Sequence, residues 1–170
     1  MKAALLFFAL VSLVAAADQT TLRSVLLSPA ERKPAPGFAL KDASGRIVKL
    51  ANYRGKVVLL DFWATWCGGC KQELPLFSEF QRTYGAKGLA VVGVSLDDDG
   101  WKVVKPFLDS NQVPYRMVLG NSSTAKRYGI GNMPDTFIID QQGRLAAAYR
   151  GGLVDRDDVD ANLRALLSTH

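Results

Sequence analysis

Both cysteines of this chain lie in one short stretch, Asp61-Phe-Trp-Ala-Thr-Trp-Cys-Gly-Gly-Cys-Lys71, and only two glycines separate them. A structural zinc site needs about four ligands, and the one histidine, His170, is the last residue. Covalent haem attachment needs a histidine after the second cysteine, where Lys71 stands. A copper site would need a histidine or methionine close by, and the neighbouring residues supply none. The pattern therefore favours a disulfide, with no metal and no other cofactor.

The pair is predicted to be redox-active rather than an inert crosslink. Closing so short a loop removes little entropy from the unfolded chain, so a purely structural disulfide would stabilise weakly here. Cys67 follows an apolar run and precedes a helical pattern, which predicts that it lies at a helix N-terminus. Backbone N–H groups and the helix dipole favour a thiolate there. We expect Cys67 to attack a substrate disulfide and Cys70, one helical turn later, to displace the reduced substrate.

The elements around the pair predict an α/β sandwich. A buried strand at Val57 to Trp63, a helix from Cys67 to about Tyr84 and a strand at Leu89 to Leu96 form a parallel βαβ unit. Further elements are predicted on both sides of this unit: an N-terminal hairpin (38–40 and 47–50), helices at 101–111 and 122–128, a strand at 115–119, an antiparallel hairpin (136–140 and 145–150) and a helix capped by Asp155. The sum is a mixed central sheet with helices on both faces.

The N-terminus is predicted to be a targeting signal. Lys2 precedes an uncharged run from Ala3 to Ala17, which is shorter than the roughly 20 residues that a spanning helix needs. Small residues before Asp18 suit cleavage by a signal peptidase. We expect an extracytoplasmic protein, periplasmic or otherwise secreted, with no stable membrane insertion after cleavage. The expected organisation is a signal peptide (1–17), a lead-in segment (18–35) and one domain (36–170).

The charge pattern gives no indication of a nucleic-acid partner. The net charge is +5, but the basic residues are dispersed along the chain without a basic run. The acidic run Asp97–Asp99 is interpreted as a solvated loop and helix cap without a catalytic role.

The sequence resembles the thioredoxin superfamily, and within it the secreted TlpA/ResA-like branch. The resemblance rests on Trp66-Cys-Gly-Gly-Cys70, on the preceding Asp-Phe-Trp-Ala-Thr, on Pro75 and on Asn-Met-Pro-Asp-Thr-Phe-Ile-Ile-Asp at 132–140. The segment from Ala35 to Leu60 also looks like the hairpin and strand that open this branch. The resemblance implies a thioredoxin-like sandwich with an added N-terminal β-hairpin, and covers the chain from about Pro36 to its end.

The resemblance also implies roles in substrate binding. Pro134 matches the cis-proline that faces the cysteine pair in this superfamily, and the ordinary alternative is a trans loop proline. The bend would present the backbone of Met133 to an extended substrate segment. Trp66 is expected to cover the thiols and contact the substrate, whereas Trp63 is expected in the core.

Two acids are candidates for the proton acceptor of Cys70. Asp61 matches the buried acid of thioredoxin, and burial would raise the pKa of this carboxyl. Glu73 matches an acidic residue of the secreted branch, and the alternative for it is a solvated helix residue. The sequence does not decide which of the two acts.

These residues indicate an extracytoplasmic thiol-disulfide oxidoreductase that reduces protein disulfides. Its substrates could include the cysteines of apocytochrome c, and a membrane thiol-reducing donor would restore the dithiol. A thiol peroxidase is the second interpretation, because the N-terminal half also resembles peroxiredoxins. Peroxiredoxins carry Thr and Pro where this chain has Ala64 and Leu60, which argues against it. A non-catalytic thioredoxin-fold binding module is the third.

Overall fold

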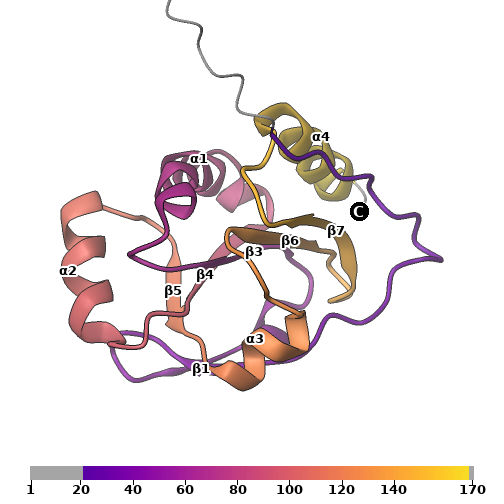
Figure 1. Cartoon of the computed structure of the whole chain (residues 1–170). Helices are drawn as coiled ribbons and strands as arrows, with labels where there is room; N and C mark the ends of the chain where they lie inside the picture. Colours follow the sequence, from indigo (N-terminus) through magenta and orange to yellow (C-terminus); the bar gives the residue numbers. More distant parts are fainter. Residues whose placement is uncertain (1–20, 169–170) are drawn as a thin grey trace, which may run out of the picture.

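A mixed sheet carries the cysteine loop at one end of its central strand. The computed structural model describes residues 21–168, so the predicted signal peptide at 1–17 lies outside the described residues. Within them the sheet has seven strands in the order β2-β1-β5-β4-β3-β6-β7 (Figure 1). The elements are β1 (Ala39–Lys41), β2 (Ile47–Lys49), β3 (Val57–Trp63), α1 (Gly68–Tyr84), β4 (Leu89–Ser95), α2 (Trp101–Asn111), β5 (Arg116–Leu119), α3 (Ser122–Tyr128), β6 (Asp135–Ile139), β7 (Leu145–Arg150) and α4 (Arg156–Leu167), with short 3-10 turns at Leu50–Tyr53 and Gly85–Lys87.

The centre of the sheet is the predicted βαβ unit. β3 and β4 pair in parallel over their full length and β5 extends the parallel part, while β6 pairs antiparallel with β3. Every residue of β3 and β4 is buried, as a strand covered on both faces must be. The predicted N-terminal hairpin forms through β1 and β2.

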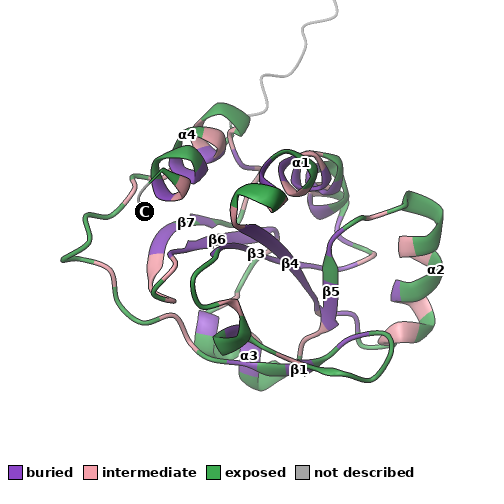
Figure 2. Cartoon of the chain, turned by 180° about the vertical axis from the view of Figure 1, so that it is seen from behind, coloured by how far each residue is buried: buried purple, intermediate pink, exposed green. Residues whose placement is uncertain are grey.

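Helices cover both faces of the sheet. Alternate side chains of β3 point to opposite faces, so Leu59 and Trp63 belong to one core cluster with α1 and α4, whereas Leu60 and Phe62 belong to the other with Tyr128 of α3. Figure 2 shows the buried strands between α1 and α4 on one side and α3 on the other. The predicted α/β sandwich is confirmed.

The observed bounds differ from the predicted ones by one residue at several ends. The strand predicted to reach Leu96 ends at Ser95, and β5 begins at Arg116 rather than Tyr115. α1 begins at Gly68 because Cys67 is its N-cap, with extended backbone angles. Gly129 ends α3 as predicted, with a φ of 65° that favours glycine.

The described part of the lead-in segment, residues 21–35, lies along β7 and the chain that enters α4. The backbone of Leu22 bonds to Leu153 and to Asp155, and Leu27 donates to the carbonyl of Ala146. Asp155 caps α4 as predicted, since its side chain accepts from the N–H of Asp158. The lead-in therefore covers an edge of the sheet that would otherwise expose unpaired backbone groups.

The packing of α1 on the sheet should dominate stability. Phe77 is fully buried in the core cluster beneath α1, so Phe77→Ala is expected to lower the free energy of unfolding by about 3–5 kcal/mol. Gln72→Ala, on the exposed side of the same helix, should change it by no more than about 0.5 kcal/mol. Urea unfolding of both variants checks this, and equal losses would contradict the described packing.

Candidate active site

The two cysteines meet at the N-terminus of α1. Their sulfurs form a disulfide, with the Cα atoms 5.3 Å apart. Cys67 is the N-cap residue, and its Sγ accepts the backbone N–H of Cys70 at 3.2 Å. The first turn of a helix has N–H groups without intrahelical partners, so in the reduced protein this N–H and the helix dipole would favour a thiolate at Cys67.

Cys67 is less buried than Cys70, as predicted. Cys67 is 7% exposed and Cys70 is fully buried, so Cys67 is the sulfur that a substrate can reach first. Trp66, immediately before it, is 68% exposed and is available to a substrate. Trp63 is fully buried and packs its ring on Phe107 of α2 at 5.4 Å, so its prediction as a core residue is confirmed.

A cis peptide bond lies against the cysteine loop. The Met133–Pro134 bond is cis, as the resemblance implied, and the carbonyl of Pro134 accepts the N–H of Gly151 at 3.0 Å. A Cβ added to Gly69 would lie 3.3 Å from Cδ of Pro134, whereas one added to Gly68 would meet no atom within 4 Å. The second glycine of the motif therefore allows the close approach of Pro134, and the first leaves open space.

Asp61 is a fully buried carboxyl on β3. It lies opposite Thr136 of β6 and Gly93 of β4, and the Thr136 hydroxyl is the polar side chain that interacts with it. Burial raises the pKa of Asp61 well above its usual value, and the charge of Glu73 raises it further, while the Thr136 hydroxyl opposes the shift. Burial therefore favours the protonated form of this carboxyl.

Glu73 is buried as well, which excludes the solvated alternative. It is 3% exposed and lies on α1 three residues after Cys70, so the two side chains share one face of the helix. Its Oε1 accepts the N–H of Val154 at 2.7 Å, and its Oε2 has no partner in the described chain. Burial raises the pKa of Glu73 to about 7, and the Val154 N–H opposes the shift.

The interpretation of Asp97 as a solvated loop residue is wrong. The residue is buried and its carboxylate accepts both the N–H of Thr65, at 3.0 Å, and the Thr65 hydroxyl. The Ser95 hydroxyl donates to the same carboxylate at 2.8 Å. The helix cap is also different, since Gly100 precedes α2 and makes no side-chain cap. Asp97 thus holds the loop between β3 and Cys67, a role that only the pairing of β3 with β4 could indicate.

Other chemistries have little support at the site. No group of three or more His, Cys, Asp or Glu side chains among residues 21–168 is placed to hold a metal ion. Ala64 and Leu60, at the positions where peroxiredoxins carry Thr and Pro, are fully buried apolar side chains. Neither can donate a hydrogen bond to a peroxide at Cys67.

The chain is similar in sequence and in structure to known proteins. Residues 32–148 match the AhpC/TSA family. The thiol-disulfide oxidoreductase ResA of Geobacillus thermodenitrificans is 32% identical over 133 residues, or 78% of this chain and 75% of that protein. The thioredoxin-like protein YneN of Bacillus subtilis is 33% identical over 129 residues, or 75% of each chain. A DsbF homologue from Corynebacterium diphtheriae superposes with a TM-score of 0.76 at 25% identity, covering 85% of this chain and 94% of that one.

The sandwich, the cysteine pair at the helix N-terminus and the cis-proline beside it define a redox protein of the thioredoxin fold. The chain belongs to the AhpC/TSA family, and it is a thiol-disulfide oxidoreductase of the ResA type.

Glu73 should make the oxidised protein less stable as the pH rises. A carboxyl whose pKa is raised in the folded state binds more protons there than in the unfolded state, so stability falls between the two pKa values. For Glu73 these are its usual 4.5 and about 7, a difference worth about 3 kcal/mol. Glu73→Gln should therefore be more stable than the wild type at pH 8 and similar to it at pH 4.5.

Urea unfolding at several pH values measures this difference. The matched control is Glu79→Gln on the same helix, because Glu79 is paired with Arg156 at the surface and its pKa is lowered. The control should show no stabilisation relative to the wild type between pH 5 and 8. If the stability of the wild type relative to Glu73→Gln does not fall between pH 5 and 8, the raised pKa of Glu73 is contradicted.

Proposed function

We propose that this protein reduces disulfides of other proteins in an extracytoplasmic compartment. The observation that carries the proposal is the Cys67–Cys70 pair at the beginning of α1, where a backbone N–H is directed at the Sγ of Cys67. The less buried cysteine, Cys67, precedes the fully buried Cys70 along the chain, which is the order that a reductase needs.

The reaction consists of two exchanges. The thiolate of Cys67 attacks one sulfur of a substrate disulfide, so that a mixed disulfide forms and the other substrate sulfur leaves as a thiolate. Cys70 then loses its proton and attacks the Sγ of Cys67. The mixed disulfide breaks, the second substrate sulfur leaves as a thiolate, and the Cys67–Cys70 disulfide forms. The two electrons that the substrate gains come from the two cysteines.

Glu73 is the proposed acceptor of the Cys70 proton. It shares a helix face with Cys70 and its pKa is about 7, so near neutral pH a large fraction of it is ionised and able to take a proton. Burial raises the pKa of Asp61 well above its usual value and favours its protonated form. We therefore assign Asp61 the part of a neutral neighbour of Glu73 rather than that of the proton acceptor.

Substrate binding is assigned to the surface around Cys67. The backbone of Met133, before the cis-proline, is proposed to pair with an extended substrate segment. The exposed ring of Trp66, next to Cys67 in the chain, offers an apolar contact for the substrate. Such short pairing suits a reductase that must release its substrate after each exchange.

The proposed location, electron donor and substrate rest on the sequence and on the resemblance. The uncharged run before Asp18 supports export, although it lies outside the described residues, and within residues 21–168 no helix is long and apolar enough to cross a membrane. A membrane thiol-reducing partner is the proposed electron donor. Apocytochrome c, with its cysteines awaiting haem, is the proposed substrate.

Two probes test the reductase and its substrate separately. With dithiothreitol as donor, the wild type should reduce insulin and an oxidised Cys-X-X-Cys-His peptide, Cys67→Ser should reduce neither, and Cys70→Ser should form a mixed disulfide with the peptide, visible by mass spectrometry. Retained activity in Cys67→Ser, or no reduction of either probe by the wild type, would reject the reductase. Reduction of insulin but not of the peptide would reject only the cytochrome substrate.

A further inference from the structure

Residues 151–155, which connect β7 to α4, contact the cis-proline and the cysteine loop together. The N–H of Gly151 donates to the carbonyl of Pro134 at 3.0 Å. The Cδ2 atom of Leu153 lies 3.6 Å from the point that a Cβ of Gly69, between the two cysteines, would occupy. The position of this connection therefore affects the surroundings of the redox pair.

One peptide group of the connection, between Leu153 and Val154, is hydrogen-bonded at both ends. Its N–H donates to the Oε1 of Glu73 at 2.7 Å. Its carbonyl oxygen accepts the backbone N–H of Leu22, in the lead-in segment, at 2.6 Å. The N–H and C=O of a trans peptide point in opposite directions, so this group lies between the lead-in segment and the acid. Leu22 and Glu73 are thus linked through a single peptide group.

Leu22 also holds the connection on the far side of Val154. The carbonyl of Leu22 accepts the N–H of Asp155 at 2.8 Å, so Leu22 and Val154 form a parallel bridge. The Leu22 side chain packs on the connection as well, because its Cδ1 atom lies 3.3 Å from the point that a Cβ of Gly152 would occupy. Figure 1 shows the lead-in segment in indigo beside the chain that enters α4. The backbone of Leu22 therefore fixes the connection on both sides of the N–H that reaches Glu73.

We propose that Leu22 is a positioning residue for the proton acceptor: its backbone holds the peptide before Val154 so that the N–H of this peptide stays on one oxygen of Glu73 and the other oxygen is left for the incoming proton. A hydrogen bond to the carbonyl of a peptide polarises the group and makes its N–H a stronger donor. The inference rests on the proposed second exchange, in which Cys70 gives its proton to Glu73. Leu22 gives and takes no proton or electron, so the balance of that exchange is unchanged.

The direction of the effect follows from the charge state that the N–H stabilises. A donor stabilises a carboxylate more than a carboxylic acid, so the Val154 N–H lowers the pKa of Glu73 and opposes the effect of burial. Without the bond from Leu22, this donor is weaker and less well placed, and the pKa should rise above its value of about 7. A smaller fraction of Glu73 would then be ionised at neutral pH, and the second exchange would need a higher pH.

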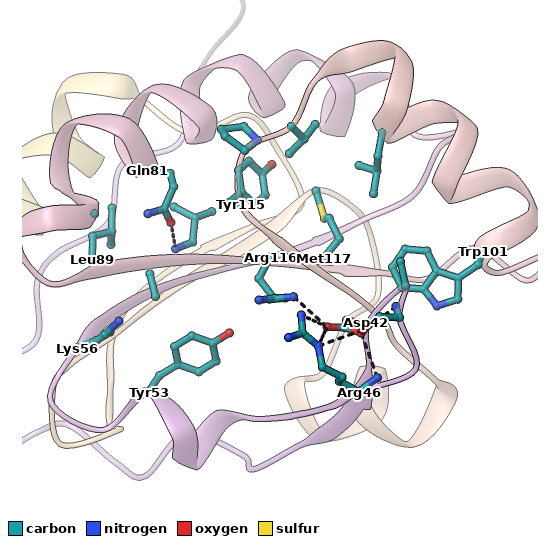
Figure 3. A pocket seen from close by; sticks show the side chains of 18 residues that line it. Asp42, Arg46, Tyr53, Lys56, Gln81, Leu89, Trp101, Tyr115, Arg116 and Met117 are labelled. Atoms are coloured by element: carbon teal, nitrogen blue, oxygen red, sulfur yellow. Dashed lines mark hydrogen bonds and ion pairs between the residues drawn. The ribbon is translucent and has the colours of Figure 1, made fainter.

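The other titratable groups around Glu73 belong to different elements. Cys70 shares its helix face, and Asp61 of β3 and Tyr115 before β5 both have a pKa that the charge of Glu73 raises. Figure 3 shows Tyr115 in the wall of a surface cavity of about 670 Å³. None of the residues that line this cavity belongs to the described lead-in segment or to the connection. The lead-in segment therefore reaches Glu73 through the connection rather than through this cavity.

The test removes the N–H of Leu22 alone. Leucic acid, the α-hydroxy analogue of leucine, places an ester oxygen at position 22 and keeps the side chain. The matched control is leucic acid at position 27, because the N–H of Leu27 also donates from the lead-in segment to a backbone carbonyl, that of Ala146 in β7, at 2.9 Å. Carbon-13 NMR titration of the side-chain carboxyls in the oxidised protein gives the midpoint of Glu73. The ester at position 22 should raise this midpoint by about half a pH unit, which is about a threefold change in proton affinity, and the ester at position 27 should leave it in place.

A second ester tests the path from Leu22 to Glu73. The α-hydroxy analogue of valine at position 154 removes the donor itself, so it should raise the midpoint by about one pH unit. Adding the ester at position 22 should then change nothing more, because both act through the same N–H. The pH at which the second exchange reaches half its maximal rate should rise by the same amounts. If the ester proteins do not fold, the wild type serves instead: the amide-proton shifts of Val154 and Leu22 should both change with the midpoint of Glu73, and that of Leu27 should not.

An unchanged midpoint with the ester at position 22, or one equally changed with the ester at position 27, would overturn the proposal. So would a further rise when the ester at position 22 is added to the one at position 154, or, in the wild type, a Leu22 amide shift that does not follow the midpoint of Glu73. The titration needs no turnover. A failure to reduce insulin would therefore count against the proposed function alone, and a static midpoint against the role of Leu22 alone.

Discussion

The structure depends on the hydrogen bond between the backbone N–H of Cys70 and the sulfur of Cys67 at the beginning of α1. This N–H lies at the N-terminus of a helix, where the helix dipole is positive, so it favours a negative charge on that one sulfur. The parallel β3–α1–β4 unit creates this position, because α1 begins where the buried β3 ends. Asp97, at the end of the neighbouring β4, holds the intervening loop through Thr65. The fold thus presents one thiol at the edge of a rigid sheet.

The second constraint is the burial of two acids beneath that thiol pair. Burying Asp61 and Glu73 raises the pKa of each carboxyl, which works against stability above neutral pH. The same burial supplies a proton acceptor whose pKa lies near the working pH, which ordinary exposed carboxylates do not offer. Burying these carboxyl groups therefore lowers the stability of the fold where the chemistry needs a carboxyl of raised pKa. The packing of the surrounding aromatic and aliphatic side chains compensates for this loss of stability.

Much of this arrangement could be predicted from local sequence. The apolar run of β3, the cysteine spacing and the cap at Asp155 are short-range signals, and the structure confirms each of them. The cis bond at Pro134 could be expected only from the resemblance, because local sequence does not select the isomer. The role of Asp97 could not be predicted from the sequence. It arises from a contact between the residues after β4 and the loop after β3, which lie far apart along the sequence and meet only in the folded sheet.

We propose that the reduced protein carries a Cys67 thiolate of lowered pKa, which can be measured from the pH dependence of its alkylation rate. In Cys70→Ser the backbone N–H at position 70 remains and Cys67 is the one thiol, so its reaction with iodoacetamide can be followed from pH 4 to pH 10. The account predicts a midpoint below about 7.5. A midpoint at about 8.5, the value of an ordinary cysteine, would contradict it.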